Sequence, residues 1–206
     1  MKLYYTPGAC SLASHIVLEW IGKPYELQKV SIHPPKSPEL LQVNPQGAVP
    51  VLEEDGWVLT QNMAVLNYLA DSCAASGLCG DNSPRYRARV NHWLAFLNSD
   101  VHTAFKPLFG ATQYLGDATV IEHTKQQASK TIVRLLTVVN QQLEQTDYLT
   151  GALSMADAYL YVVLRWTASL AIDISALTAL QRFVDRMEAN AGVKKALEME
   201  GLKNIG

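Results

Sequence analysis

The stretch that decides the fold of this chain is Lys2-Leu3-Tyr4-Tyr5-Thr6-Pro7-Gly8-Ala9-Cys10-Ser11. Its apolar start predicts a short strand, and the Pro-Gly pair that follows is a strong turn signal. Leu12, Ile16 and Trp20 come next at helical spacing, so they share one face of a helix. Gly22 and Pro24 end that helix, because glycine suits the left-handed residue after a helix and proline cannot continue one. The stretch therefore predicts a strand, a tight turn and a helix.

Cys10 lies at the predicted start of this helix. Unpaired backbone N–H groups and the positive end of the helix dipole meet there, and both favour a thiolate over a thiol. One interpretation is therefore a reactive cysteine. The other is a small buried apolar residue, which is the commonest role of a free cysteine. The stretch alone leaves both interpretations open.

Composition excludes several classes of protein. The 206 residues are 49% hydrophobic and 17% charged with a net charge of −2, which suits one large or two small domains and shows no basic excess for nucleic acid. No apolar run approaches the roughly 18 residues of a membrane span, and Pro7-Gly8 interrupts any signal-peptide core. Cys10, Cys73 and Cys79 have no metal-ligand spacing. We expect a cytoplasmic protein with no metal and no membrane or nucleic-acid partner.

The first part of the chain reads as a small α/β domain. The elements predicted after the first helix are a strand at 25–32, a proline-rich loop at 33–38, a helical turn at 39–43, a turn and strand over 44–53, a strand at 57–59 after the Asp55-Gly56 turn, and a helix from 62. This order is βαβ followed by ββα, which requires a parallel pair and an antiparallel pair of strands. We expect this domain to span residues 1–76, with a linker at 77–86.

The rest of the chain, residues 87–206, is predicted to be an all-helical domain. Its apolar periodicity predicts helices at 86–105, 120–143, 155–168, 177–189 and 193–199. Ser154 and Asp157 have the spacing of a capping box before the third of these. That helix is apolar almost all round, which is typical of the centre of a bundle.

Five motifs occur in one order along the chain: residues 1–16 (Met-Lys-Leu-Tyr-Tyr-Thr-Pro-Gly-Ala-Cys-Ser-Leu-Ala-Ser-His-Ile), 44–52 (Asn-Pro-Gln-Gly-Ala-Val-Pro-Val-Leu), 59–62 (Leu-Thr-Gln-Asn), 101–109 (Val-His-Thr-Ala-Phe-Lys-Pro-Leu-Phe) and 154–160 (Ser-Met-Ala-Asp-Ala-Tyr-Leu). With these motifs the chain resembles the cytosolic glutathione transferases over its whole length, and specifically their bacterial beta class. The order and spacing of the five make the resemblance specific.

The resemblance implies an α/β plus all-α fold, with a thioredoxin-like N-terminal domain (βαβ-ββα) followed by an all-helical C-terminal bundle domain, and a cytoplasmic homodimer. Glutathione is the implied co-substrate and lies against the first domain, with a small-molecule electrophile between the two domains. Catalytic roles are carried over to Cys10, Ser11 and His102. The residues assigned to glutathione binding are Ala9, Cys10, Ile32, Lys36, Val49, Pro50, Gln61, Asn62, Ser99 and His102.

These assignments make physical sense, although each residue also has a structural interpretation. The resemblance implies a cis peptide before Pro50, which would present the backbone of Val49 to the cysteinyl unit of glutathione; alone, Pro50 reads as an edge-strand breaker. Gln61-Asn62 would hold the γ-glutamyl end at a helix N-terminus, or Thr60 or Asn62 would simply cap the helix. His102 as an imidazolium would stabilise a thiolate, and as a neutral ring it would take a proton; otherwise it ends a helix.

The chain departs from the family pattern at three positions. Gln61 stands where the family usually has Glu, Thr103 where a lysine commonly follows the histidine, and Ala95 where an asparagine precedes it. The amide of Gln61 can still accept from the ligand's ammonium group, but it loses an ion pair worth on the order of 1.5–3 kcal/mol. We therefore expect altered or weakened glutathione binding.

The expected function is transfer of the glutathione thiolate to electrophilic, mostly apolar substrates, with a role in detoxification. The expected wall of the second-substrate site consists of Phe105, Leu108, Phe109, Tyr114 and Trp166. Two alternatives stay open. Because the turn motif holds one cysteine, Cys10 could exchange disulfides through a mixed disulfide with glutathione. The departures could instead leave a non-catalytic binder of hydrophobic ligands.

Overall fold

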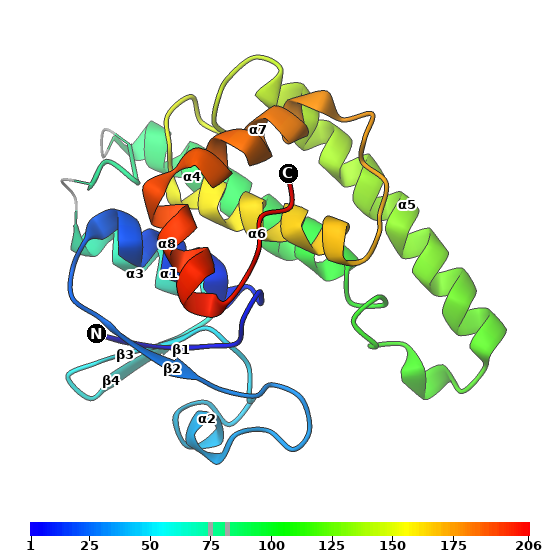
Figure 1. Cartoon of the computed structure of the whole chain (residues 1–206), viewed down its shortest axis with the longest axis horizontal. Helices are drawn as coiled ribbons and strands as arrows, with labels where there is room; N and C mark the ends of the chain where they lie inside the picture. Colours follow the sequence, from blue (N-terminus) through cyan, green and yellow to red (C-terminus); the bar gives the residue numbers. More distant parts are fainter. Residues whose placement is uncertain (74–75, 81–82) are drawn as a thin grey trace.

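The computed structural model describes residues 1–73, 76–80 and 83–206, and folds into a sheet-containing half and a helical half (Figure 1). The elements of the first half are β1 (Lys2–Tyr5), α1 (Ser11–Ile21), β2 (Glu26–Lys29), α2 (Pro38–Val43), β3 (Val51–Glu54), β4 (Trp57–Thr60) and α3 (Asn62–Ser72). The predicted βαβ-ββα order is confirmed. Gly22 adopts the left-handed conformation after α1, with φ of 65°, as expected for a helix-ending glycine.

The four strands form one mixed sheet in the order β2-β1-β3-β4. β1 pairs in parallel with β2 and antiparallel with β3, and β3 pairs antiparallel with β4. β2 is shorter than the predicted strand at 25–32. Its partner β1 ends at Tyr5, where Pro7 in the following turn has no N–H to extend the ladder.

Side chains of β1 alternate between two cores, as the period of a strand requires. Leu3 and Tyr5 face the large core shared with α1 and the helical half. Tyr4 faces a second, smaller core beneath α2, where it packs with Val49 and Val51. The sheet is therefore covered on both faces, by α2 on one side and by α1 and α3 on the other (Figure 1).

The second half of the chain is helical. Its elements are α4 (Pro84–Ala95), the π-helix η2 (Phe96–His102), the 3₁₀ turn η3 (Gln113–Leu115), α5 (Ala118–Leu143), α6 (Met155–Ser169), α7 (Thr178–Ala189) and α8 (Ala191–Glu200). α4 begins at Pro84, inside the segment predicted as a linker; residues 74–75 and 81–82 of the region between α3 and α4 lie outside the described residues. The single helix predicted at 86–105 is two helical types in sequence, because the backbone changes to a π-helix at Phe96.

α6 is the centre of the helical half, as its sequence predicts. Twelve of its residues are buried, and the helix packs against α1 of the first half as well as against α4 and α7. The predicted capping box of Ser154 and Asp157 is present. One hydrophobic core runs from β1 through α1 to α6 and α8, so the two halves share an apolar interior.

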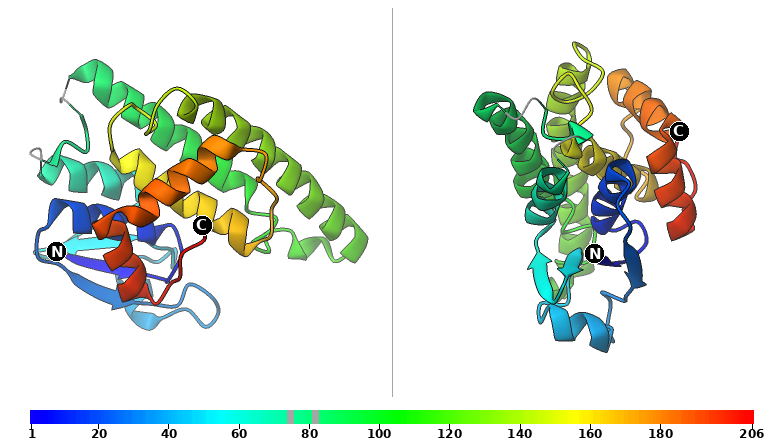
Figure 2. Two further views of the ribbon diagram at one scale, coloured as in Figure 1. Left: turned by 45° about the horizontal axis from the view of Figure 1, so that its top comes forward. Right: turned by 90° about the vertical axis from the view of Figure 1, so that its left-hand side faces the viewer.

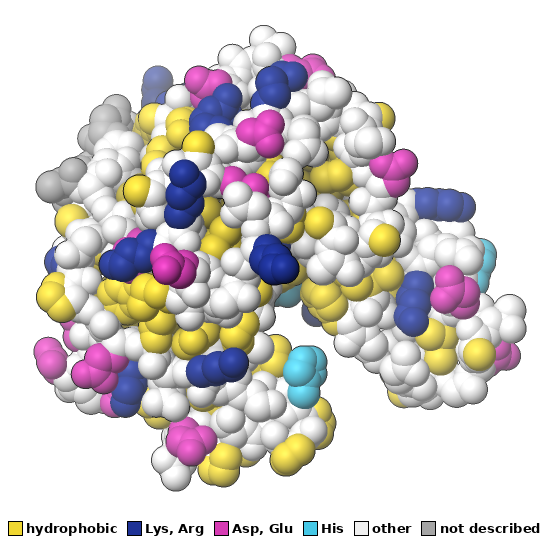
Figure 3. Space-filling model, viewed as in Figure 1, with side chains coloured by type: hydrophobic (Ala, Val, Ile, Leu, Met, Phe, Trp, Pro, Cys, Tyr) yellow, Lys and Arg dark blue, Asp and Glu magenta, His cyan; other side chains and the backbone are white. Residues whose placement is uncertain are grey.

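The N-terminal end of α5 projects away from the rest of the molecule (Figure 1 and Figure 2). The space-filling view shows a hollow between this projecting end and the lobe that contains α2 (Figure 3). Among the described residues, no helix has the length and apolar character needed to span a bilayer.

Candidate functional site

A cavity of about 120 Å³ lies where the two halves meet. Its walls come from the start of α1, the loop before β3, the start of α3 and the π-helix η2. The lining residues are Cys10, Asn44, Gln46, Ala48, Val49, Pro50, Thr60, Gln61, Asn62, Asn98 and His102. The structure thus brings together six of the residues assigned from the sequence: Cys10, Val49, Pro50, Gln61, Asn62 and His102.

Cys10 precedes the first turn of α1, and its thiol donates to the Val49 carbonyl oxygen at 3.2 Å. Burial raises the pKa of this thiol to about 12, although the backbone N–H groups of Cys10 and Ser11 act in the opposite direction. In the protein without ligand the burial of Cys10 therefore favours the thiol over the thiolate. The helix start does lower the pKa, but loss of hydration in the cavity wall outweighs it.

The Val49–Pro50 peptide is cis, as the resemblance implies. The Val49 carbonyl reaches the Cys10 thiol from the far wall of the cavity. The loop before it is held by Asn44, whose side chain donates to the Ala48 carbonyl and accepts from the Gln46 N–H. This loop is thereby fixed at the cavity wall.

The start of α3 has no side-chain cap, so the interpretation of Thr60 or Asn62 as a simple helix cap is wrong. Gln61 precedes the helix with a positive φ of 73°, which is uncommon for a residue with a Cβ. Asn62 is buried; its Oδ1 accepts from the Ser14 hydroxyl at 3.3 Å, while its Nδ2 has no hydrogen-bond partner among the described residues. An uncapped helix start with an unpaired amide N–H suits a carboxylate.

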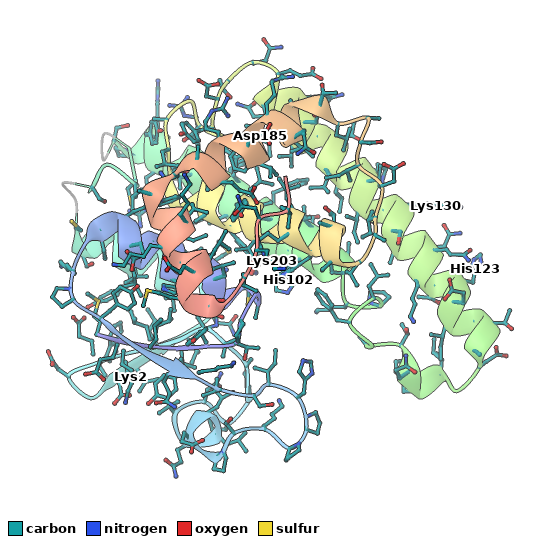
Figure 4. All side chains as sticks on the ribbon, viewed as in Figure 1. Lys2, His102, His123, Lys130, Asp185 and Lys203 are labelled. Carbon is teal, nitrogen blue, oxygen red and sulfur yellow. The ribbon has the colours of Figure 1, made fainter. Side chains whose placement is uncertain are left out.

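His102 ends the π-helix η2 and lies between the two halves (Figure 4). Its Nδ1 is 2.6 Å from the hydroxyl oxygen of Tyr159, and its ring centroid is 4.6 Å from that of Trp166. Burial, assisted by the positive charge of Lys106, lowers the pKa of His102 to about 4. The ring is therefore neutral at pH 7 in the protein without ligand, and in this state it can accept a proton.

Five other residues assigned from the sequence do not line the cavity. Ser11 is fully buried and its hydroxyl bonds to the backbone of Thr6. Ala9 and Ile32 pack against the core beneath α2. The ammonium group of Lys36 donates to the Gln46 carbonyl, and Ser99 is exposed. A catalytic role for Ser11 and glutathione-binding roles for Ala9, Ile32, Lys36 and Ser99 stay predictions.

Sequence reasoning missed several residues of the site. Asn98 precedes His102 by four residues, about one helical turn. This spacing, which puts both side chains on one face of a helix, is the signal that could have pointed to Asn98. Tyr159 lies behind the cavity, fully buried on α6, and contacts both Asn98 and His102. Tyr159 belongs to the motif at 154–160, but nothing in that motif indicates its contact with His102, because the contact depends on how α6 packs against η2.

The Gly8 peptide, in the turn before Cys10, is held on both sides by the helical half. The Trp166 indole Nε1 donates to the Gly8 carbonyl at 2.8 Å, and the Gly8 N–H donates to a carboxylate oxygen of Glu200 at 2.9 Å. The other oxygen of Glu200 is 2.9 Å from Nδ1 of the fully buried His15. Residues far apart in sequence thus fix the turn that carries the cysteine.

Aromatic side chains beside His102 form an apolar surface. The rings of Phe105 and Phe109 stack with centroids 5.8 Å apart, and Phe109 lies edge-on to Trp166 at 5.4 Å. Phe105 is fully buried and backs this surface, whereas Phe109 is 51% exposed. Tyr114 is 83% exposed, so the structure does not pack it into an apolar wall.

Comparisons with known proteins agree over the whole chain. The family model of the glutathione S-transferase N-terminal domain matches residues 1–71, and that of the C-terminal domain matches residues 98–191. Glutathione S-transferase GST-4.5 of Xanthomonas campestris pv. campestris is 49% identical over 203 residues, which cover 98% of this chain and 100% of that protein.

Solved structures give the same result. The glutathione S-transferase from Xylella fastidiosa has a TM-score of 0.95 at 48% identity, covering 98% of this chain and 99% of its own. A beta-class enzyme of Sphingomonas chungbukensis has a TM-score of 0.87 at 36% identity, and a sphingomonad enzyme complexed with glutathione has 0.86 at 39%; both comparisons cover 98% of this chain and 100% of theirs. The resemblance inferred from the five motifs is confirmed, and the chain belongs to the glutathione S-transferase family.

Proposed function

We propose that this cavity binds glutathione and that the protein transfers the glutathione thiolate to an electrophilic carbon. The single observation that carries the proposal is the shared cavity: a cysteine at a helix start, the Val49 backbone, an uncapped helix start with an unpaired amide, and a neutral histidine line the same space. A sphingomonad relative complexed with glutathione supports the choice of ligand.

Each wall of the cavity has a distinct task in this proposal. The start of α3 with Asn62 holds the γ-glutamyl carboxylate, and the Val49 backbone pairs with the cysteinyl unit once glutathione replaces the Cys10 thiol at its carbonyl. His102 accepts the thiol proton of glutathione. The backbone N–H groups at the start of α1 stabilise the resulting sulfur anion by preorganised charge.

The transfer step then forms one S–C bond. The glutathione sulfur attacks the electrophilic carbon, and the leaving group departs with the electron pair of the broken bond. The exposed face of Phe109, backed by the buried indole of Trp166, holds an apolar electrophile beside the sulfur, which removes much of the entropic barrier of a two-molecule reaction.

Conjugation of 1-chloro-2,4-dinitrobenzene, measured together with retention on immobilised glutathione, tests the proposal. We expect retention and turnover in the wild type, and retention with a kcat/KM reduced about 10²- to 10⁴-fold in His102→Gln, the range of general-base catalysis. If the wild type is retained on immobilised glutathione but turns over none of several activated aryl halides, the transferase proposal is refuted and a non-catalytic binder is favoured.

Exchange of disulfides is the second candidate function, because Cys10 itself lies in the cavity. A Cys10 thiolate would attack a mixed disulfide of glutathione and release the other thiol, and a second glutathione would then regenerate Cys10. Cys10→Ala separates the two candidates. A variant that conjugates normally but no longer reduces mixed disulfides would show that exchange depends on Cys10 while transfer does not.

Three further features belong to this proposal. The domain limits of 1–76, 77–86 and 87–206, a homodimer, and a cytoplasmic location remain predictions from the sequence and the resemblance. Light scattering coupled to size-exclusion chromatography tests the homodimer directly.

A further inference from the structure

The hydroxyl of Tyr159 lies at the centre of a buried polar cluster behind the cavity. Tyr159 is fully buried on α6, and its hydroxyl oxygen is 2.6 Å from Nδ1 of His102 and 3.2 Å from Oδ1 of Asn98. The side chain of Asn62 also lies near enough to act on the pKa of this hydroxyl. The cluster therefore joins α6, η2 and the start of α3 around one oxygen atom.

Counting protons in this cluster fixes the roles of its members. A tyrosine hydroxyl has one proton to donate, and an amide oxygen can only accept. The Tyr159 hydroxyl donates to Asn98 Oδ1, so it has no proton left for His102. With that proton placed on Asn98, Nδ1 of His102 donates to the hydroxyl oxygen.

We propose that Tyr159, oriented by Asn98, is a positioning residue that keeps neutral His102 in the tautomer with its proton on Nδ1. Nε2 then has a free lone pair, and it has no hydrogen-bond partner among residues 1–73, 76–80 and 83–206. In the proposed function, on which this inference rests, Nε2 is the atom that accepts the thiol proton. The opposite tautomer would present an N–H there and could not accept it.

The surroundings of the ring support this assignment. Trp166 lies 4.6 Å from the imidazole centroid at an interplanar angle of 61°, which limits rotation of the ring out of the hydrogen bond. The low pKa of His102 keeps the ring neutral, so one of its nitrogens must be unprotonated. The charged or titratable groups that act on this cluster are Lys106, beside His102, and Cys10, beside Tyr159.

Nitrogen-15 NMR of the full-length protein, labelled at histidine, tests the proposal, because protonated and unprotonated ring nitrogens have well-separated shifts. His102→Gln assigns the signals of His102 among the five histidines. We expect wild-type His102 to be protonated at Nδ1 at pH 7. Tyr159→Phe removes the acceptor and should leave a mixture of tautomers. Asn98→Ala frees the hydroxyl proton for Nδ1 and should shift the proton of His102 to Nε2.

Tyr161→Phe is the matched control. Tyr161 is also fully buried on α6, and its hydroxyl is also hydrogen-bonded, but to Glu188 and Arg165 rather than to His102. This variant loses a buried hydroxyl of the same kind and should leave the His102 tautomer unchanged. A His102 protonated at Nε2 in the wild type would overturn the inference, as would Tyr159→Phe and Asn98→Ala spectra identical to that of the wild type.

Kinetics separate this inference from the proposed function. We expect Tyr159→Phe to lower kcat/KM for conjugation at least about tenfold, below the 10²- to 10⁴-fold limit of general-base catalysis, with a smaller effect on the KM for glutathione. A tautomer shift without a change in rate would support the positioning role of Tyr159 and refute His102 as the base. If Tyr159→Phe does not fold, the NMR spectrum of Asn98→Ala by itself tests the tautomer assignment.

Discussion

Replacing Asp157 with Ala tests the buried carboxylate that begins the central helix. Asp157 is fully buried at the start of α6 and accepts three hydrogen bonds. Its donors are the Leu149 N–H at 2.9 Å and both the N–H and the hydroxyl of Ser154 at 2.8 Å. Asp157→Ala leaves the Leu149 and Ser154 N–H groups without this acceptor in the interior.

The structure gives both the size of the effect and its pH dependence. Two buried N–H groups without an acceptor cost about 2–6 kcal/mol together, at about 1–3 kcal/mol each. Burial raises the pKa of Asp157 from 3.8 to about 6 despite these hydrogen bonds. The folded state therefore binds the proton of Asp157 more tightly than the unfolded state does. The stability that this proton adds is fully present below pH 3.8 and is lost as the pH rises through 6. Between pH 5 and pH 7 this contribution to the free energy of unfolding falls by about 1.3 kcal/mol.

Urea unfolding followed by far-UV circular dichroism at pH 5 and pH 7 measures both quantities. Protein concentration must be held constant, because association of folded chains adds stability by mass action. We expect Asp157→Ala to cost about 2–6 kcal/mol at pH 5 and about 1.3 kcal/mol less at pH 7. Asp173→Ala is the control: this exposed carboxyl has a lowered pKa, so both pH values lie above its titration and its cost should not change. A cost for Asp157→Ala that is equal or larger at pH 7 would refute the reasoning.

Three further predictions concern single residues. Ser154→Ala removes only the hydroxyl from the capping box and should lower the free energy of unfolding by about 0.5–2 kcal/mol; an unchanged melting temperature would contradict this. Gln61→Glu restores an ion pair with the ligand's ammonium group and should tighten glutathione binding roughly ten- to hundredfold, as 1.5–3 kcal/mol implies; weaker binding by calorimetry would contradict it. The Cys10 thiol, with a pKa near 12, should react slowly with iodoacetamide at pH 8 in the absence of ligand, and its rate should still rise with pH above 9. A rate plateau below pH 9, measured by mass spectrometry, would show that burial does not control this thiol.

The fold could be predicted because its signals are local. The Pro7-Gly8 turn, the helical spacing of the apolar residues in α1 and the apolar circumference of α6 are each readable within a few consecutive residues. The extent of β2 could not be predicted, because a strand ends where its neighbour stops offering backbone partners. The π-helix at Phe96 likewise replaces an α-helix without any breaker in the sequence.

The site could be predicted only in part. The motifs located Cys10 and His102, but the charge state of each depends on burial, which overrides the local effect of a helix end at Cys10 and removes the charge of His102. Asn98 and Tyr159 are 61 residues apart in the chain and meet only when η2 packs against α6. Contacts of this kind leave no periodic trace in a sequence.

The hydrogen bonds that the helical half makes to Gly8 limit how the halves of this protein can be exchanged with those of other proteins. The turn before Cys10 belongs to the first half by sequence. Yet the carbonyl and the N–H of Gly8 in this turn are hydrogen-bonded to Trp166 and Glu200 of the second half. A hybrid that joined this first half to the helical half of another protein would keep the turn in place only if the new half supplied an indole N–H and a carboxylate at matching positions. The geometry of the turn before Cys10 therefore depends on both halves together, so the two halves are not independently exchangeable modules.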